Sequence, residues 1–336
     1  MLDFAGKRWY YLTVSGILFV IAAICLGLFG LQPGIEFTSG SSFTFEFTQN
    51  TVGQDELRTE MKNLNHGEAR IQGAGNNTYI IRTSELKGAP AIESTDLGPT
   101  PASEGEIDRL QAALCQKFGA PGENGVCTGV NRKDFSTVSE TVSSQLARNA
   151  TIAVIAASIA ILVYISISFR KLQRSYLYGA SAIIAVLHDA FIVLGLFALL
   201  GEFRGTEVDT AFITAILTVI GFSVHDTIVV FDRIRETVLH DPYVPFEEAV
   251  NASMTETLAR SINTSFAVVL TVVSMLLIGG STIQNFLLVL LVGIISGTYS
   301  SIGIASQLLV AFERNDIGKC FRRIRGKDAE VAAQAV

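Results

Sequence analysis

The chain has 336 residues, of which 49% are hydrophobic and 17% are charged, and its formal net charge is −6. Soluble domains carry about 25% charged residues, whereas here short charged segments separate long uncharged ones, which is typical of membrane proteins. The sequence contains no basic stripe interleaved with aromatic residues, which argues against nucleic-acid binding.

Six apolar segments are long enough, or nearly long enough, to cross a bilayer, which takes about 20 residues. They are residues 11–31, 150–168, 176–200, 210–231, 264–278 and 286–312. The first could instead be a signal peptide, but no cleavage site of the Ala-x-Ala type follows it. The fifth is the shortest, and we expect it to gain a turn from residues 260–263.

Lysine and arginine residues gather at alternate ends of the spans. One side of the membrane would hold Lys7, Arg8, Arg170, Lys171, Arg174, Arg233, Arg235, Arg260 and a basic tail over residues 315–336. The other side would hold residues 201–209 and 279–285, with Arg204 as the only basic residue. Because basic loops stay in the cytoplasm, we expect residues 1–10 and the tail to be cytoplasmic. Spans two to six with their loops then occupy residues 150–314.

The long segment over residues 32–148 would lie outside the cytoplasm and fold by itself. Its pattern predicts strands and helices in the order strand 42–48, helix 53–64, strand 68–72, strand 78–83, helix 104–118 and strand 129–138. This order matches the split βαβ arrangement of ferredoxin-like domains. The predicted fold class is therefore a six-helix membrane bundle with one α+β ferredoxin-like domain between helices one and two. His66 is expected in an exposed turn of this domain.

Cys115 and Cys127 fall in the same polar region, with several glycines and a proline between them. If the region is outside the cytoplasm, a disulfide between them is possible. Two unpaired thiols are the alternative, and the sequence does not choose between them.

Two carboxylates lie well inside apolar spans, and a histidine directly precedes each. Asp189 follows His188 in the third span, and Asp226 follows His225 in the fourth. A charge at mid-span costs roughly 2.5–3.5 kcal/mol on insertion scales, so such residues usually face a cavity or a partner. Carboxylates and histidines carry protons when burial and neighbours shift their pKa values. The pairs therefore indicate proton-coupled transport, although a structural hydrogen-bonding role is the plain alternative.

Arg233 lies seven residues beyond Asp226 and therefore on nearly the same helix face, about 10.5 Å along the axis. The two side chains could line one polar track toward the cytoplasm. A snorkelling arginine at the end of a span is the alternative. Outside the spans, Glu36, Glu202 and Asp209 are expected to be solvated.

Residues 245–258 place four apolar side chains at near-helical spacing, at Phe246, Val250, Met254 and Leu258. This pattern predicts an amphipathic helix, either lying on the inner membrane surface or packed on the helix bundle. In the sixth span, Gly293 and Gly297 fit the small-xxx-small pattern of close helix packing.

Four segments carry a resemblance to a known family. They are residues 217–236 (LTVIGFSVHDTIVVFDRIRE), 186–195 (VLHDAFIVLG), 258–265 (LARSINTS) and 34–40 (GIEFTSG). The first closely resembles the fourth span of the SecD/SecF family of protein-export membrane proteins. The others resemble its third span, the start of its fifth span and the Gly-x-Asp-Phe-x-Gly-Gly motif that opens its outside domain. The segments occur in the right order over nearly the whole chain.

The resemblance implies a bundle related to resistance–nodulation–division transporters, a complex with SecD, and work beside the SecYEG channel. It implies that the proton gradient powers the pulling of exported polypeptide on the outer face of the cytoplasmic (inner) membrane of a bacterium. The implied proton path comprises Asp189, Asp226 and Arg233, with His188 and His225 beside it. The implied motif residues are Gly34, Glu36, Phe37 and Gly40 at the start of the outside domain, and Arg260, Asn263 and Thr264 at the start of the fifth span.

Three positions depart from the family pattern. Glu36 stands where the family has Asp, Ser39 where it has Gly, and His225 where Asn is common. Because Gly tolerates a positive φ and Ser does not, Ser39 puts the usual tight turn in doubt. His225 adds a titratable group beside Asp226, which we expect to shift its working pH.

Two other functions compete with proton-driven export. Asp189 and Asp226 could form the dyad of an intramembrane aspartyl protease, which needs two carboxylates sharing a proton, but the Tyr-Asp and Gly-x-Gly-Asp motifs of those proteases are missing. A structural subunit that conducts no protons is the second alternative. No phosphate loop, metal cluster or dinucleotide fingerprint is visible in the sequence, so we expect no cofactor, no metal and no covalent catalysis.

Overall fold

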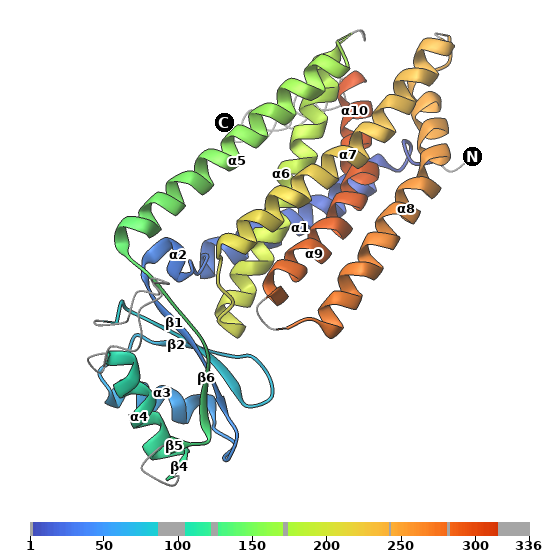
Figure 1. The fold of residues 1–336 in the computed structure, drawn as a ribbon. Helices are drawn as coiled ribbons and strands as arrows, with labels where there is room; N and C mark the ends of the chain where they lie inside the picture. The colour runs from blue at the N-terminus through green and yellow to red at the C-terminus, as the bar shows by residue number, and fades with distance from the viewer. Residues whose placement is uncertain are drawn as a thin grey trace, which may run out of the picture. The chain divides into compact units, whose positions relative to one another are not determined.

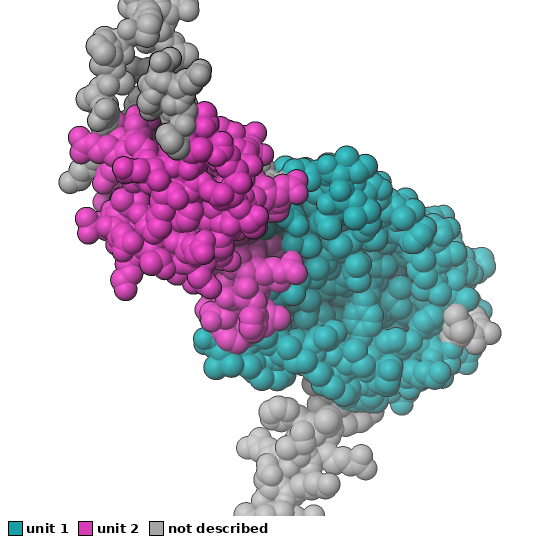
Figure 2. Space-filling view, turned by 90° about the horizontal axis from the view of Figure 1, so that it is seen from below, with its two compact units in different colours: residues 1–28, 154–196, 214–336 teal, residues 29–153, 197–213 magenta. Residues whose placement is uncertain are grey.

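The computed structural model describes residues 3–86, 105–121, 127–170, 174–241, 243–280 and 283–314. These residues form two compact units, shown in different colours in Figure 2. Unit 1 comprises residues 1–28, 154–196 and 214–336, and unit 2 comprises residues 29–153 and 197–213. The predicted tail over residues 315–336 lies outside the described residues.

In the part of the chain that the structure describes, six helices are long and apolar enough to cross a membrane, as the sequence predicted. In chain order they are α1 (Arg8–Phe29), α5 (Glu140–Ser168), α6 (Ser175–Arg204), α7 (Thr210–His240), α8 (Phe246–Ile278) and α9 (Gln284–Ser300), which continues through a π-helix (Ser301–Ala305) into α10 (Ser306–Glu313) (Figure 1). Several are longer than their apolar segments, because polar turns extend the helix beyond each segment.

The helices differ in how much of their surface is buried within the chain. Half of the most apolar stretch is buried in α7 and in α9–α10, whereas none of it is buried in α5 and 11% in α1. The exposed side chains of α5 are large and apolar, among them Ile152, Ile155 and Ile159. A surface of this kind suits contact with lipid, so α6, α7 and α9 form the buried centre of the bundle.

Helix α9 packs closely on α7 through the two glycines that the sequence indicated. A side chain at Gly293 would overlap Val219 of α7, and a Cβ atom at Gly297 would lie 3.0 Å from the Cβ atom of Ser223. Small residues allow helix backbones to approach in this way. The prediction of close packing at Gly293 and Gly297 is confirmed.

The amphipathic segment and the fifth span form one continuous helix, α8, of 33 residues. Val250 and Met254 are buried in the main core of unit 1, and Leu258 packs against that core. Of the two alternatives for this segment, the structure favours a helix packed on the bundle.

One acidic and two basic side chains meet at one end of unit 1. Glu247 at the start of α8 forms ion pairs with Arg8 at the start of α1, at 3.1 Å, and with Arg314 at the end of α10. The start of α1, the start of α8 and the end of α10 therefore lie at the same end of the bundle.

Unit 2 contains a four-stranded antiparallel sheet with the order β2-β3-β1-β6. Its elements are α2 (Ile35–Thr38), β1 (Gly40–Phe47), α3 (Gln54–Asn63), β2 (Arg70–Gly73), β3 (Thr78–Thr83), α4 (Glu106–Phe118), the short pair β4 (Ala120–Pro121) and β5 (Cys127–Thr128), and β6 (Val130–Val138). The six predicted strands and helices are all present, with ends that differ by one or two residues.

Alternation along β1 builds the core of unit 2. Phe43, Phe45 and Phe47 are buried, while the residues between them are partly exposed on the other face of the sheet. The buried phenylalanines join Leu57 of α3 and Leu114 of α4 in one hydrophobic core. The two helices therefore cover the same face of the sheet.

His66, expected in an exposed turn, is buried, with 8% of its surface accessible. Its Nδ1 atom lies 3.2 Å from the Thr83 hydroxyl, and carboxylates of Glu68 and Glu106 lie 3.7 Å from the ring nitrogens. The expectation was wrong because its turn folds back against β3.

Ser39 keeps the tight turn that its replacement of glycine put in doubt. Its φ of 62° and ψ of 163° fall in a backbone region that is essentially reserved for glycine. The Ser39 hydroxyl donates to the Thr38 carbonyl at 2.5 Å, and Gly40 follows with a φ of 132°. The turn between α2 and β1 therefore carries local backbone strain.

We predict that Ser39→Gly stabilises the chain. Backbone strain of this kind costs about 1–3 kcal/mol, and glycine loses about 0.5–1 kcal/mol to chain entropy, which leaves a gain of up to about 2.5 kcal/mol. Chemical denaturation of the detergent-solubilised chain measures it. The matched control, Ser42→Gly within β1, should instead be destabilising. A loss of stability in both variants would contradict the strain.

Candidate functional site

The Asp189 side chain is buried at mid-helix in α6, with 1% of its surface exposed. Three serine hydroxyls donate hydrogen bonds to its carboxyl group. Ser223 of α7 donates to Oδ2 at 2.6 Å, Ser296 of α9 to Oδ1 at 2.7 Å, and Ser300 of α9 to Oδ2 at 2.5 Å. Both carboxyl oxygens are therefore satisfied, and the carboxyl group links α6 to α7 and α9.

The close approach of α7 and α9 makes this arrangement possible. Ser296 and Ser300 are four residues apart, so they face the same side of α9. Gly297 lies beside Ser223 because neither residue has a bulky side chain at the contact. The glycines thus bring serines of both helices within reach of one carboxyl group.

Asp226 in α7 is buried as well, and the Ser301 hydroxyl donates to its Oδ2 atom. Ser301 is the first residue of the π-helix, whose carbonyls also accept side-chain donors: Ser306 donates to the Ser301 carbonyl at 2.9 Å and Gln307 to that of Ile302 at 3.1 Å. Short π-helical turns are frequent at functional sites. The irregular turn of the sixth span thus lies at the second buried carboxyl group.

The two histidines differ in their surroundings. His188 is buried, and its Nδ1 atom lies 3.3 Å from the Asp189 carboxyl group, while its Nε2 atom is buried without a hydrogen-bond partner in the described part of the chain. His225 is exposed on α7 and makes no hydrogen bond to Asp226 among the described residues. No direct contact among the described residues supports the expectation that His225 shifts the working pH of Asp226, which stays a prediction.

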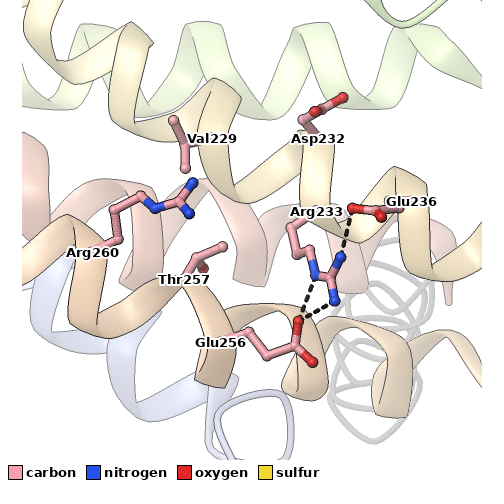
Figure 3. Close-up of a pocket in the computed structure, with 7 residues that line it drawn as sticks. All are labelled: Val229, Asp232, Arg233, Glu236, Glu256, Thr257 and Arg260. Atoms are coloured by element: carbon pink, nitrogen blue, oxygen red, sulfur yellow. Dashed lines mark hydrogen bonds and ion pairs between the residues drawn. The ribbon is translucent and has the colours of Figure 1, made fainter.

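Arg233 lies on a polar pocket of about 350 Å³ between α7 and α8, lined by Val229, Asp232, Arg233, Glu236, Glu256, Thr257 and Arg260 (Figure 3). Glu236, at 2.6 Å, and Glu256 both form ion pairs with it. No contact between Arg233 and Asp226 is found among the described residues, and the common polar track stays a prediction.

Arg260 points into the same pocket (Figure 3) and is exposed. No ion pair of its guanidinium group is found within the described ranges, in contrast to Arg233. Of the other predicted residues at the start of the fifth span, Asn263 is exposed and the Thr264 hydroxyl donates to the Arg260 carbonyl at 2.8 Å. The start of this span is thus the middle of α8.

The motif residues 34–40 form a second polar site, in unit 2. Gly34 donates its backbone N–H to the Val208 carbonyl at 2.8 Å, and Glu36 accepts a backbone hydrogen bond from Thr210 at the start of α7. Phe37 is partly buried, and a side chain on Gly40 would meet the Thr83 carbonyl. The motif therefore contacts the turn between α6 and α7.

Burial raises the pKa of Glu36 above its usual value of 4.5, and the neighbouring Asp209 carboxylate raises it further. Burial also raises the pKa of Glu207 in the same turn, against the lowering effect of Arg82 and Arg70. The expectation that Glu36 is solvated was wrong, because the turn between α6 and α7 packs over it.

Cys115 is buried in α4 and is disulfide-bonded. The side chain of Cys127 lies outside the described residues, so the pairing of Cys115 with Cys127 stays a prediction. Within the described ranges, no group of three or more His, Cys, Asp or Glu side chains is placed to hold a metal ion.

Sequence reasoning missed the serine donors, Ser223, Ser296, Ser300 and Ser301, as well as Glu207. A serine pair at i and i+4 in an apolar helix was a usable signal, because such a pair presents two hydroxyls on one helix face. Glu207 has no comparable signal, since acidic residues are common in short loops.

The six membrane-length helices among the described residues define a multi-pass membrane protein, and the buried carboxyl groups give its bundle a polar interior. The family model described as protein export membrane protein SecD/SecF, C-terminal, matches residues 123–315. Over 96% of its length the chain is 39% identical to the protein translocase subunit SecF of Thermobaculum terrenum, of which it covers 98%. The chain belongs to the SecD/SecF family, and it matches SecF subunits over nearly their full length.

Longer relatives match as well. The protein translocase subunit SecDF of Bacillus subtilis is 35% identical over 94% of this chain, which covers 39% of that protein. The crystal structure of SecDF from Thermus thermophilus superposes with a TM-score of 0.76 at 29% identity, covering 93% of this chain and 39% of that one. The chain thus corresponds to less than half of each SecDF protein.

We predict that Ser300→Ala destabilises the bundle by about 1–3 kcal/mol, because it removes a donor from a buried carboxyl group. The free energy of unfolding in detergent measures the loss. Ser274→Ala is the control, since the exposed Ser274 hydroxyl bonds only to the Leu270 carbonyl among the described residues. Equal effects of the two substitutions would contradict a special role for the Asp189 contacts.

We also predict a pH effect at Glu36. Its raised pKa means that the folded chain binds this proton more tightly than the unfolded chain. Stability is therefore lost as the pH rises from about 4.5 through the folded-state pKa. Glu36→Gln should unfold at a higher temperature than the parent chain at neutral pH, with the difference vanishing below about pH 4.5.

The exposed Glu85 provides the control for this pH effect, through Glu85→Gln. Unfolding temperatures recorded over the same pH series should leave this control unchanged relative to the parent chain. If Glu36→Gln and the parent chain unfold at the same temperature at every pH, burying the Glu36 carboxylate has no cost in stability.

Proposed function

We propose that this chain is a proton-driven subunit of a Sec protein-export complex, with Asp189 as its central proton-binding group. The observation that carries the proposal is a carboxyl group buried in a membrane-length helix and surrounded by hydroxyls from two other helices. A charge at mid-span is costly in lipid. Its retention among adjustable donors favours a group that gains and loses a proton.

Protonation would change the hydrogen bonds that join the three central helices. An ionised carboxylate only accepts, so all three serine hydroxyls can donate to it. A protonated carboxyl group carries a donor of its own, which a hydroxyl that turns or the His188 Nδ1 atom can accept. A change at Asp189 thereby alters the contacts of α6 with α7 and α9. One charge moved through 100 mV supplies about 2.3 kcal/mol for such a change.

Asp226 and Arg260 extend the proposed path toward the cytoplasmic side. Asp226 supplies a second buried carboxyl group, on the helix that also provides Ser223. Between the two arginines of the polar pocket, Arg260 is the better candidate for exchange with a carboxylate, because Arg233 is already paired with Glu236 and Glu256. The side chain of Arg233 then serves mainly to hold α7 to α8.

The remaining parts of the proposal concern partners and sidedness. We infer an extracytoplasmic, ferredoxin-like domain over residues 32–148, which the strand order β2-β3-β1-β6 supports. Both termini are cytoplasmic, and the membrane is the bacterial cytoplasmic (inner) membrane. The partners are SecD, in line with the single-chain SecDF relatives, the SecYEG channel, exported polypeptide and the lipid bilayer. The chain catalyses no covalent reaction and uses no cofactor.

The two competing functions receive less support. A protease dyad needs two carboxyl groups that share a proton, whereas Asp189 and Asp226 bond to different serines and not to each other among the described residues. The close packing at Gly293 and Gly297 suits a structural subunit, but it also brings the serines to Asp189. The structural subunit therefore remains the function to test against.

We predict that Asp189→Asn and Asp226→Asn each reduce export to the level seen without a proton gradient. The assay is gradient-driven export in vesicles that hold the assembled complex. Glu202→Gln is the control, since Glu202 is exposed near the end of α6, away from the polar pocket. Arg260→Gln should impair gradient-driven export more strongly than Arg233→Gln.

The structural-subunit function makes the opposite prediction. If both aspartate variants keep full gradient-dependent export, the carboxyl groups carry no protons and the chain acts as a scaffold. A greater loss of export with Arg233→Gln than with Arg260→Gln would contradict only the assignment of Arg260 to the proton path.

A further inference from the structure

The turn between α6 and α7, residues 205–209, contains a carboxylate that the proton path does not use. Only 3% of the Glu207 side chain is exposed. One of its oxygens lies 3.2 Å from Nε of Arg82 in β3, and the other lies 3.9 Å from Nη1 of Arg70 in β2. A buried carboxylate in the turn is therefore paired with two arginines of the sheet.

The main chain makes a second attachment beside Glu207. Val208 donates its N–H to the Gln32 carbonyl at 2.7 Å and accepts from the Gly34 N–H at 2.8 Å. These bonds form an isolated parallel bridge between Pro33 and Val208. The segment that leads into the sheet is thus bonded to the same turn, one residue away from the buried carboxylate.

The start of α7 makes a third attachment. Asp209 accepts the Phe212 N–H at 2.7 Å, and Glu36 accepts a backbone hydrogen bond from Thr210. Acidic groups at a helix N-terminus satisfy free N–H groups and interact favourably with the helix dipole. The first turn of α7 is therefore fixed both by its own cap and by the motif residue Glu36.

The attached turn joins the two helices that carry the buried carboxyl groups. Asp189 lies 15 residues before the end of α6 and Asp226 lies 16 residues after the start of α7, or roughly 22 and 24 Å along the helix axes. An α-helix is held by hydrogen bonds along its whole length, so displacement at one end is passed along it. The turn that is bonded to the sheet is thus continuous along the chain with both of these helices.

We propose that Glu207 is a positioning residue for proton-driven export, which fastens the α6–α7 turn to β2 and β3 so that the sheet and the helix pair move together. The inference rests on the function proposed above. Separating the turn from the sheet would break the ion pairs of Glu207 and the main-chain hydrogen bonds of Val208 together. An apolar contact of the same size would slide more easily, because it has no required direction.

The test compares Glu207→Gln with Glu202→Gln, a control at an exposed acid near the end of α6. Two quantities are measured in vesicles that hold the assembled complex: gradient-stimulated export, and the protonation change of Asp189 followed by infrared spectroscopy. We expect Glu207→Gln to keep the protonation change and to lose gradient stimulation of export. Coupling between sites usually amounts to roughly 5- to 150-fold, so the loss should be at least about fivefold. The control should keep both.

A variant with the two charges exchanged distinguishes a positioning role of Glu207 from a role in folding. Glu207→Arg combined with Arg82→Glu restores an ion pair between turn and sheet with the charges reversed. We expect this double variant to recover gradient-stimulated export relative to either single change. If Glu207→Gln does not fold, the double variant still decides, because a folded chain with an ion pair but no coupling overturns the inference.

The outcomes also separate this inference from the function on which it rests. Full gradient stimulation in Glu207→Gln would overturn the role of Glu207 and leave the proton-driven function intact. A parent complex whose Asp189 shows no protonation change would overturn the proposed function and this inference with it.

Discussion

The structure of the bundle depends on how the Asp189 carboxyl group is satisfied. A polar group in hydrocarbon must find its partners within the protein, and Asp189 finds them in serines of two neighbouring helices. Those serines reach it only because α9 has glycines where it meets α7. The small residues between α7 and α9 therefore serve the contacts of this carboxyl group.

A change in the hydrogen bonds of the same carboxyl group would also change the contacts between the helices. Serine hydroxyls can donate or accept, so the network has more than one possible arrangement. A helix contact built on glycine and serine offers little apolar area to oppose a small shift. At the other end of α6 and α7, the contacts are of a different kind: a buried ion pair and main-chain bonds hold the turn to the sheet. The hydrogen bonds at Asp189 can rearrange, whereas the α6–α7 turn is fixed to the sheet. This combination suits two helices that transmit a movement from the bundle to the sheet.

Much of this arrangement could be predicted from the sequence, and the exceptions have physical causes. Apolar length identified the spans and alternation identified β1, because both patterns report directly on burial. Asp189 and Asp226 stood out because charges are rare in apolar segments. The serine donors did not, since serine is tolerated in membrane helices with or without a partner. Residues 245–258 show the same periodicity whether they cover lipid or helix, so the sequence left α8 undecided.

The site in unit 2 was harder to predict for another reason. Glu207, Arg82 and Arg70 come from three separate segments, and only the fold brings them together. Likewise, the spacing of seven residues places Arg233 on the same helix face as Asp226, yet its guanidinium group forms an ion pair with Glu256 of α8. Ser39 shows that a residue which disfavours a backbone conformation can still adopt it when the surrounding turn is fixed on both sides.

The most direct test of the account is the protonation state of Asp189 itself. Infrared difference spectra of the purified complex, recorded between high and low pH, detect the carbonyl band of a protonated carboxyl group. We expect one component of this band to grow reversibly at low pH, to be absent in Asp189→Asn and to be retained when Asp232 is replaced by Asn. A carboxyl group at Asp189 that keeps one protonation state at every pH, with or without a proton gradient, would contradict it.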